Sequence, residues 1–150
     1  MNAEAAYKAC EAITRESAAN FYYGIRILPR PKRDALNAVY ALARRVDDIA
    51  DGDLPKDRKL FELGGVRELL ESLETVDDDP VAVALTDASK RFPIPYSAFS
   101  DLVDGVEMDV SGTSYETFDD LLLYCGRVAG SIGRLSLSIF GSKYPELAKS

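Results

Sequence analysis

The sequence of 150 residues contains no histidine. Without histidine the chain cannot form a Ser-His-Asp or Cys-His catalytic arrangement, and it cannot bind zinc or iron through imidazole. Any chemistry must therefore depend on carboxylates, arginines, tyrosines or a hard metal ion.

Cysteines and membrane signals are also scarce. The two cysteines, Cys10 and Cys125, lie far apart, so they do not indicate a disulfide framework and they favour a reducing, cytoplasmic location. The N-terminal "MNAEAAYKAC" lacks the charged and apolar regions of a signal peptide. The most apolar stretch, residues 121–140, is interrupted by Arg127 and Arg134, which predicts a buried helix rather than a membrane span.

Positive charge is in short supply. The chain carries 25 acidic and 18 basic residues, a net charge of −7, whereas a nucleic-acid binder needs a basic surface for its phosphate contacts. We therefore expect no nucleic-acid partner. With 47% apolar and 29% charged residues, the composition is that of one ordinary globular domain.

No segment shows the alternation typical of a strand, and apolar residues recur at intervals of three and four. The sequence therefore predicts an all-α bundle. Six helical segments are expected, at residues 3–19, 31–51, 57–74, 80–90, 99–109 and 117–140. Pro145 and Glu146 are typical of the opening of a seventh helix, and the sequence stops soon after them. We therefore expect a fragment of a longer domain.

The most distinctive segment is "ARRVDDIADG", residues 43–52, at the expected C-terminal end of the second helix. A helix C-terminus carries about half a negative charge, so carboxylates there are unfavourable. At about 100° per residue, one edge of this helix aligns five polar side chains, those of Tyr40, Arg44, Asp47, Asp48 and Asp51.

Two interpretations of this edge are open. In the first it is solvated, and Arg44 pairs with Asp47 and Asp48, each pair contributing about 0.2–0.5 kcal/mol. In the second it is a Mg²⁺ site, because magnesium prefers oxygen ligands and usually takes one or two carboxylates together with substrate phosphates. Asp47, Asp48 and Asp51 would then be the metal ligands, and the planar guanidinium of Arg44 would hold phosphate oxygens.

The last helix has two contrasting faces. One carries Tyr124 and Val128, and the opposite one carries Gly126, Gly130 and Gly133. Each glycine in a helix costs up to about 1 kcal/mol, so three on one face predict close approach by another group, most simply a packed helix.

Two signatures resemble one known family. "NFYYGIRILPRPKRDALNAVYALARRVDDIADG" resembles the first conserved region of the squalene and phytoene synthases, and "YCGRVAGSIGRL" resembles their second. The segment "GVEMDV…YETFDDLLLYC" between them is also similar to the family. The wording of "NFYYGIR…LPRPKR" and "RRVDDIADG" looks closest to the bacterial presqualene diphosphate synthases of the hopanoid and squalene route.

The resemblance implies an all-α isoprenoid synthase bundle and a prenyltransferase of isoprenoid biosynthesis. With Mg²⁺, it would condense two farnesyl diphosphates head to head to presqualene diphosphate or a squalene-type product, and NADPH would be needed only to continue to squalene. A phytoene synthase that uses two geranylgeranyl diphosphates is the alternative. The resemblance assigns catalysis to Asp47, Asp48, Asp51 and Tyr124, and substrate binding to Arg44, Tyr40, Phe21 and Val128. An apolar product allows a peripheral membrane association.

The second aspartate-rich motif of the family lies downstream of the second signature, and no DxxxD follows Tyr124 here. We therefore expect residues 1–150 to be the N-terminal part of a single synthase domain and to be inactive alone. A non-catalytic helical fragment with a solvated acidic edge is the alternative from another class. A terpene cyclase would share the acidic helix but would not explain "YCxxVAGxxG". The sequence predicts no oligomeric state.

Overall fold

The computed structural model describes residues 1–112 and 118–140, and for residues 118 and 120–126 it describes the backbone alone. Within these ranges the chain is helical and contains no strand, which confirms the all-α fold class. The helices are α1 (Ala3–Ser17), α2 (Ala19–Ile25), α3 (Arg30–Asp51), α4 (Lys56–Glu71), the 3₁₀ turn η1 (Leu73–Thr75), α5 (Pro80–Ala88), α6 (Tyr96–Val110) and α7 (Phe118–Phe140). The helix expected at Pro145 lies outside the described residues.

Most helix ends follow from local sequence signals. Pro31 lies in the first turn of α3, where its missing N–H costs no hydrogen bond. Asp79 is the N-cap of α5, and its Oδ1 accepts a hydrogen bond of 3.0 Å from the backbone N–H of Val81. Pro80 follows directly as the first helical residue.

Helix α2 is the element that sequence periodicity missed. Ala18 leaves the helical conformation at φ −147° and ψ 66°, so α1 ends at Ser17 and a separate helix of seven residues begins at Ala19. A helix this short has too few turns to show an apolar periodicity. Its position matters because it brings Phe21 to the side of α3.

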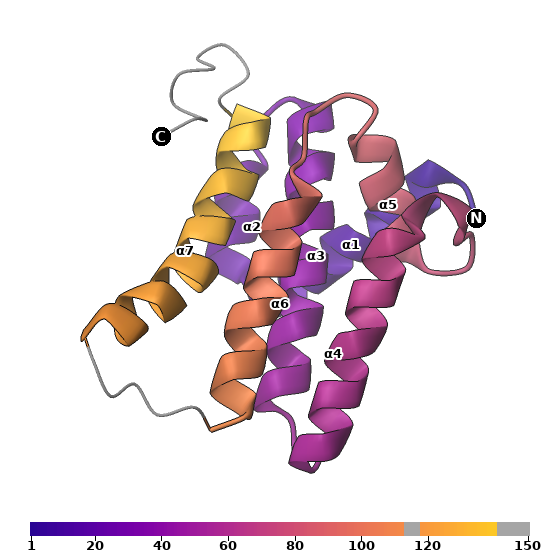
Figure 1. Ribbon diagram of the computed structural model, residues 1–150. Helices are drawn as coiled ribbons and strands as arrows, with labels where there is room; N and C mark the ends of the chain where they lie inside the picture. Colours follow the sequence, from indigo (N-terminus) through magenta and orange to yellow (C-terminus); the bar gives the residue numbers. More distant parts are fainter. Residues whose placement is uncertain (113–117, 141–150) are drawn as a thin grey trace.

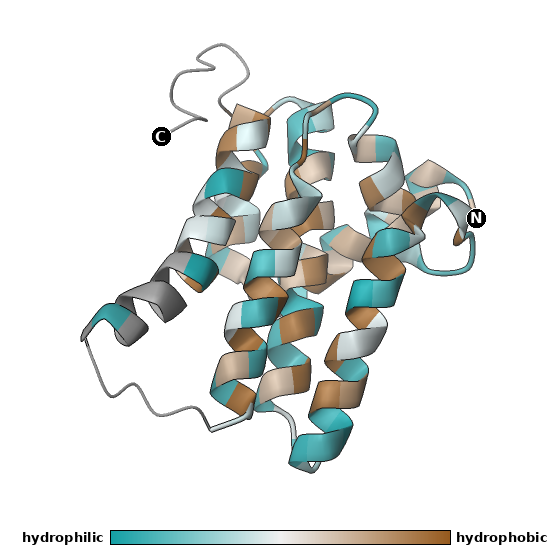
Figure 2. Cartoon of the chain, viewed as in Figure 1, coloured by the Kyte–Doolittle hydropathy of each residue, from teal (hydrophilic) through white to brown (hydrophobic). Residues whose placement is uncertain are grey.

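The long helix α3 is the centre of the bundle. It contacts α1, α4, α5, α6 and α7, and Figure 1 shows it behind α6, with α7 on one side and α4 on the other. Its apolar side chains face inward, as the brown faces in Figure 2 indicate, and Leu42 and Val46 are completely buried. Each such side chain contributes about 1.5–3 kcal/mol to folding through its removal from water.

Charged side chains join α6 to both of its outer neighbours. Arg67 of α4 donates to Asp104 and, at 3.1 Å, to Glu107. Arg134 of α7 donates to Asp101 at 2.6 Å. The position of α6 beside α3 is therefore held from two sides.

The close approach between helices occurs at a glycine other than the expected ones. A Cβ on Gly130 or Gly133 would meet no other described atom within 4 Å. A Cβ on Gly105 of α6, in contrast, would lie 2.8 Å from Cγ2 of Val128 and 3.3 Å from Cβ of Arg127. No described residue therefore approaches Gly130 or Gly133, and the surroundings of Gly126 lie outside the described residues, so the expected close approach at these three glycines stays a prediction.

The prediction that residues 121–140 form a helix is confirmed by α7. Across the described ranges, none of the helices combines the length and the apolarity that crossing a membrane requires.

Candidate functional site

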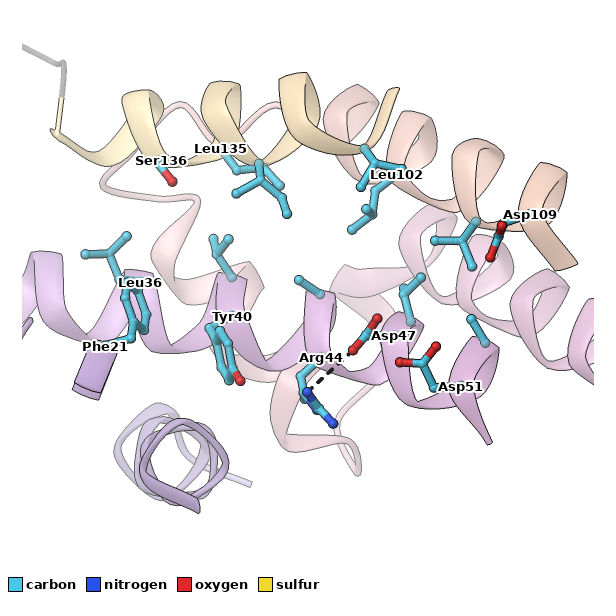
Figure 3. A pocket seen from close by; sticks show the side chains of 17 residues that line it. Phe21, Leu36, Tyr40, Arg44, Asp47, Asp51, Leu102, Asp109, Leu135 and Ser136 are labelled. Carbon is cyan, nitrogen blue, oxygen red and sulfur yellow. Dashed lines mark ion pairs between the residues drawn. The ribbon is translucent and has the colours of Figure 1, made fainter. Parts of the chain in front are cut away.

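A pocket of about 470 Å³ lies between α3 on one side and α6 and α7 on the other (Figure 3). One helix, α3, provides more than half of its lining, and α2 adds a single aromatic side chain. The lining residues are Phe21, Leu36, Val39, Tyr40, Ala43, Arg44, Val46, Asp47, Ala50, Asp51, Leu102, Val106, Asp109, Val128, Ile132, Leu135 and Ser136.

The pocket is polar at one end and apolar along most of its length. Figure 3 shows Asp47, Asp51 and Asp109 at one end, where α3 and α6 finish. Leu36 and Leu135 lie toward the other end. The pocket is therefore suited to a long apolar molecule with a charged head group.

Two carboxylates lie near each other at the acidic end. Asp47 and Asp51 are four residues apart and so lie on the same side of α3. Partial desolvation and the nearby Asp51 carboxylate raise the pKa of Asp47 above its usual value, although Arg44 acts in the opposite direction. Because a second carboxylate makes Asp47 harder to ionise, a divalent cation would be favourable at this place.

Arg44 stands at the edge of the pocket. Its Nη1 lies 3.4 Å from Asp47 Oδ2, and its Nη2 lies 2.8 Å from Asp48 Oδ1. Asp48 does not line the main pocket. It lines a second pocket, of about 530 Å³, between α3, α1 and the start of α4, which Arg44 also reaches. The structure therefore brings Asp47 and Asp51 together at the acidic end and separates Asp48 from them.

Of the other residues that the sequence predicted for the site, three line the pocket and the side chain of one lies outside the described residues. The rings of Phe21 and Tyr40 are 5.6 Å apart at an interplanar angle of 34°, and together they form one wall. Val128, from α7, lines the pocket opposite α3. Tyr124 belongs to α7, but its side chain lies outside the described residues.

The carboxylates at the acidic end of the pocket could supply part of the ligands of a Mg²⁺ ion. In the described part of the chain, no group of three or more carboxylate or thiol side chains is arranged to hold a metal ion by itself. Magnesium, however, usually needs only one or two carboxylates, and phosphate oxygens and water complete its six ligands. Asp47 and Asp51, with the repulsion between them, fit that partial role.

Sequence reasoning missed Asp109 and the apolar lining from α6 and α7. Asp109 was recognisable in principle, because it lies in the last turn of α6, where no basic residue balances it. That is the same unfavourable end of a helix that drew attention to Asp51. The apolar lining residues had no such signal, since side chains at core positions of a helix look alike whether they face a neighbour or a pocket.

Comparisons with known proteins identify the family of the chain. Residues 14–149 match the model of the family described as squalene/phytoene synthase. The chain is 55% identical over 140 residues to a phytoene synthase of Mycobacterium tuberculosis, covering 92% of this chain and 45% of that protein. It is 39% identical over 123 residues to a presqualene diphosphate synthase of Rhodopseudomonas palustris, covering 81% of this chain and 44% of that one.

The fold comparison gives the same family. The chain superimposes on the squalene synthase HpnC of Alicyclobacillus acidocaldarius with a TM-score of 0.81 and 30% identity, over 97% of this chain and 55% of that structure. The chain thus spans about half the length of the relatives it matches. Because the family model covers nearly all of its residues, the chain belongs to the squalene/phytoene synthase family, the head-to-head prenyltransferases.

Proposed function

We propose that the full-length protein containing this chain is a Mg²⁺-dependent prenyltransferase that joins two prenyl diphosphates head to head. This chain would contribute one side of the diphosphate site and part of the prenyl pocket. The observation that supports the proposal best is the polarity of the pocket, with Asp47, Asp51 and Asp109 at one end and a mostly apolar lining along the rest.

The acidic end is suited to the diphosphate group. Bound there, Mg²⁺ would neutralise charge on the departing diphosphate and so help the allylic carbon–oxygen bond to ionise. Asp47 and Asp51 would hold the cation, and Arg44 would donate to the phosphate oxygens through its planar guanidinium. Arg44 pairs with Asp47 and Asp48, so it is held beside this end.

The apolar part is suited to the prenyl chain. Leu36 and Leu135 would bury isoprene units and exclude water, which would otherwise quench an allylic cation. Figure 3 shows Phe21 beside Leu36, and Tyr40 between Phe21 and Arg44, so this pair of rings lines the apolar part of the pocket, where its π electrons would stabilise such a cation.

The two candidate substrates, geranylgeranyl and farnesyl diphosphate, differ in the length of the prenyl chain. The higher identity to a phytoene synthase favours two geranylgeranyl diphosphates as substrates and phytoene as the product. Farnesyl diphosphate is the second candidate, as the resemblance of the sequence motifs first suggested. A presqualene diphosphate synthase and the HpnC squalene synthase are also similar to this chain.

The test is to incubate the full-length protein with Mg²⁺ and either geranylgeranyl or farnesyl diphosphate, and to identify the product by mass spectrometry. We expect a C40 hydrocarbon from geranylgeranyl diphosphate. Presqualene diphosphate from farnesyl diphosphate would favour the second candidate, and squalene formed only with NADPH would extend it. Absence of any condensation product, or turnover that persists in EDTA, would contradict the proposal.

A further inference from the structure

The two helices that carry the acidic residues of the pocket both end beside the start of α4. Helix α3 ends at Asp51 and α6 ends at Val110, while α4 begins at Lys56. Figure 1 shows these three ends at the same end of the bundle. The first turns of α4 therefore lie close to the acidic end of the pocket.

Neither of those helix ends is balanced by its own residues. The last turn of α3 and the last turn of α6 contain no basic residue, yet each carries aspartates. The last carbonyl groups of a helix have no partner within the helix, and they carry partial negative charge. Both ends therefore need a cationic donor from elsewhere.

Two lysines of α4 provide such donors. The Nζ of Lys59 donates to the backbone carbonyl of Ala50 at 2.6 Å, and the Nζ of Lys56 donates to the carbonyl of Ser111 at 3.0 Å. Lys59 binds the turn of α3 between Asp47 and Asp51, and Ala50 itself lines the pocket. Lys59 does not line the pocket, so it acts on this turn from behind.

The two lysines differ in how tightly they are held. Lys59 is half-buried, whereas Lys56 is exposed and binds a residue beyond the end of α6. An ammonium group that is partly shielded from solvent loses less of its effect to water and salt. Lys59 is therefore the stronger of the two constraints on the acidic end.

We propose that Lys59 is a positioning residue for the cation–diphosphate site: by binding the Ala50 carbonyl it fixes the last turn of α3, so that the carboxylates of Asp47 and Asp51 stay in the arrangement that binds Mg²⁺. This inference rests on the proposed function of that site. Groups that orient metal ligands without touching the metal affect its affinity strongly, and their loss typically costs about 10–100-fold.

The experiment uses the full-length protein and four variants, Lys59→Met, Lys59→Arg, Lys56→Met and Lys8→Met. Lys8→Met is the matched control, because the Lys8 side chain is 75% exposed on α1 and its ammonium group pairs with Glu4 at 3.9 Å, away from the pocket. Titration calorimetry with Mg²⁺ and inorganic pyrophosphate measures binding, and thermal unfolding without ligand measures stability. Pyrophosphate release from prenyl diphosphate, followed against the Mg²⁺ concentration, measures turnover.

We expect Lys59→Met to weaken Mg²⁺–pyrophosphate binding about tenfold and to raise the Mg²⁺ concentration for half-maximal turnover by a similar factor. Lys59→Arg should restore most of the affinity, Lys56→Met should weaken it by less, and Lys8→Met should leave it unchanged. If Lys59→Met lowers the melting temperature but binds Mg²⁺–pyrophosphate as the wild type does, Lys59 is a structural cap alone and the inference is overturned.

The two proposals fail in different ways. If the wild type binds Mg²⁺–pyrophosphate but forms no condensed product, the proposed reaction fails, and the Lys59 comparison still decides the inference through binding. If the wild type does not bind Mg²⁺–pyrophosphate at all, both are overturned.

Discussion

Arg45 of α3 donates two hydrogen bonds, of 2.7 and 2.9 Å, to the two carboxylate oxygens of Asp79, the N-cap of α5. Its neighbour Arg44 faces the pocket edge instead. Consecutive arginines on one helix thus serve two purposes: one joins α3 to α5, and the other stays beside the candidate site. This division permits their structural and functional roles to be tested separately.

The Arg45–Asp79 pair should contribute measurably to stability. We expect Asp79→Asn to lower the free energy of unfolding at pH 7 by about 1.5–3 kcal/mol, since a hydrogen-bonded charge partner is lost from a partly buried pair. Asp78→Asn removes the same charge from an exposed neighbour and is the control. Urea unfolding measures both, and equal effects of the two variants would contradict this expectation.

The same pair has a pH dependence of known sign. Hydrogen bonding by Arg45 holds the pKa of Asp79 below its usual value, so the folded state favours the ionised carboxylate. That contribution is fully present above the pKa of the unfolded chain, about 4, and is lost as the pH falls through the lower folded value. The difference in stability between the wild type and Asp79→Asn should therefore shrink when the urea series is repeated at low pH.

Asp51 should oppose folding in the absence of a cation. Its charge lies four residues from that of Asp47, and such a like-charged pair costs about 0.2–0.5 kcal/mol. We expect Asp51→Asn to leave the melting temperature unchanged or slightly higher without ligand, and to remove the stabilisation that Mg²⁺ with pyrophosphate gives the wild type. Differential scanning fluorimetry measures both effects. An Asp51→Asn protein that Mg²⁺–pyrophosphate still stabilises would exclude a role in binding.

Asp47 gives the pH dependence of the site itself. Because desolvation and Asp51 raise the pKa of Asp47, its folded form favours the protonated carboxyl, and its unfavourable contribution to stability grows as the pH rises through that raised value. Mg²⁺ and protons compete for the same oxygens. The stabilisation by Mg²⁺–pyrophosphate should therefore increase with pH over this range in the wild type, and this increase should be absent in Asp47→Asn.

Asp47 and Asp48 should differ although they are adjacent. Only Asp47 lines the main pocket, while Asp48 lines the second one and pairs with Arg44 at 2.8 Å. We expect Asp47→Asn to reduce Mg²⁺–pyrophosphate affinity about tenfold or more, and Asp48→Asn to reduce it by a smaller factor through the freed Arg44. Calorimetry measures both. If neither variant binds more weakly than the wild type, this edge of α3 is merely solvated, and its interpretation as a cation–diphosphate site fails.

Gly105 should be needed for the close packing of α6 against α7. An added Cβ would lie 2.8 Å from Cγ2 of Val128, whose β-branched side chain has little freedom to move away. Overpacking of this kind costs about 1–3 kcal/mol, against a gain of up to about 1 kcal/mol from alanine in a helix. We therefore expect Gly105→Ala to lower stability by about 1 kcal/mol in urea unfolding. Gly64→Ala on α4, where a Cβ meets nothing within 4 Å, is the control and should be neutral or stabilising.

The local features of this protein can be predicted from its sequence. The all-α class, the cap at Asp79 and the end of α3 at Asp51, just before Gly52, follow from periodicity and capping chemistry, which operate over a few residues. The alignment of Tyr40, Arg44, Asp47 and Asp51 along one pocket also follows from the turn of a single helix. Helix α2 did not follow, because seven residues are too few to show a period.

The amino-acid sequence by itself determined which side chains share a face of each helix, because about 100° per residue sets that arrangement before any packing occurs. Only the tertiary structure decided which faces meet. It brought Asp109 of α6 to the acidic end, left Asp48 outside the lining of that pocket, and placed Lys59 of α4 on the Ala50 carbonyl. These positions depend on side-chain contacts between helices that are distant in sequence, such as the contact between Gly105 and Val128. No local sequence pattern predicts such contacts.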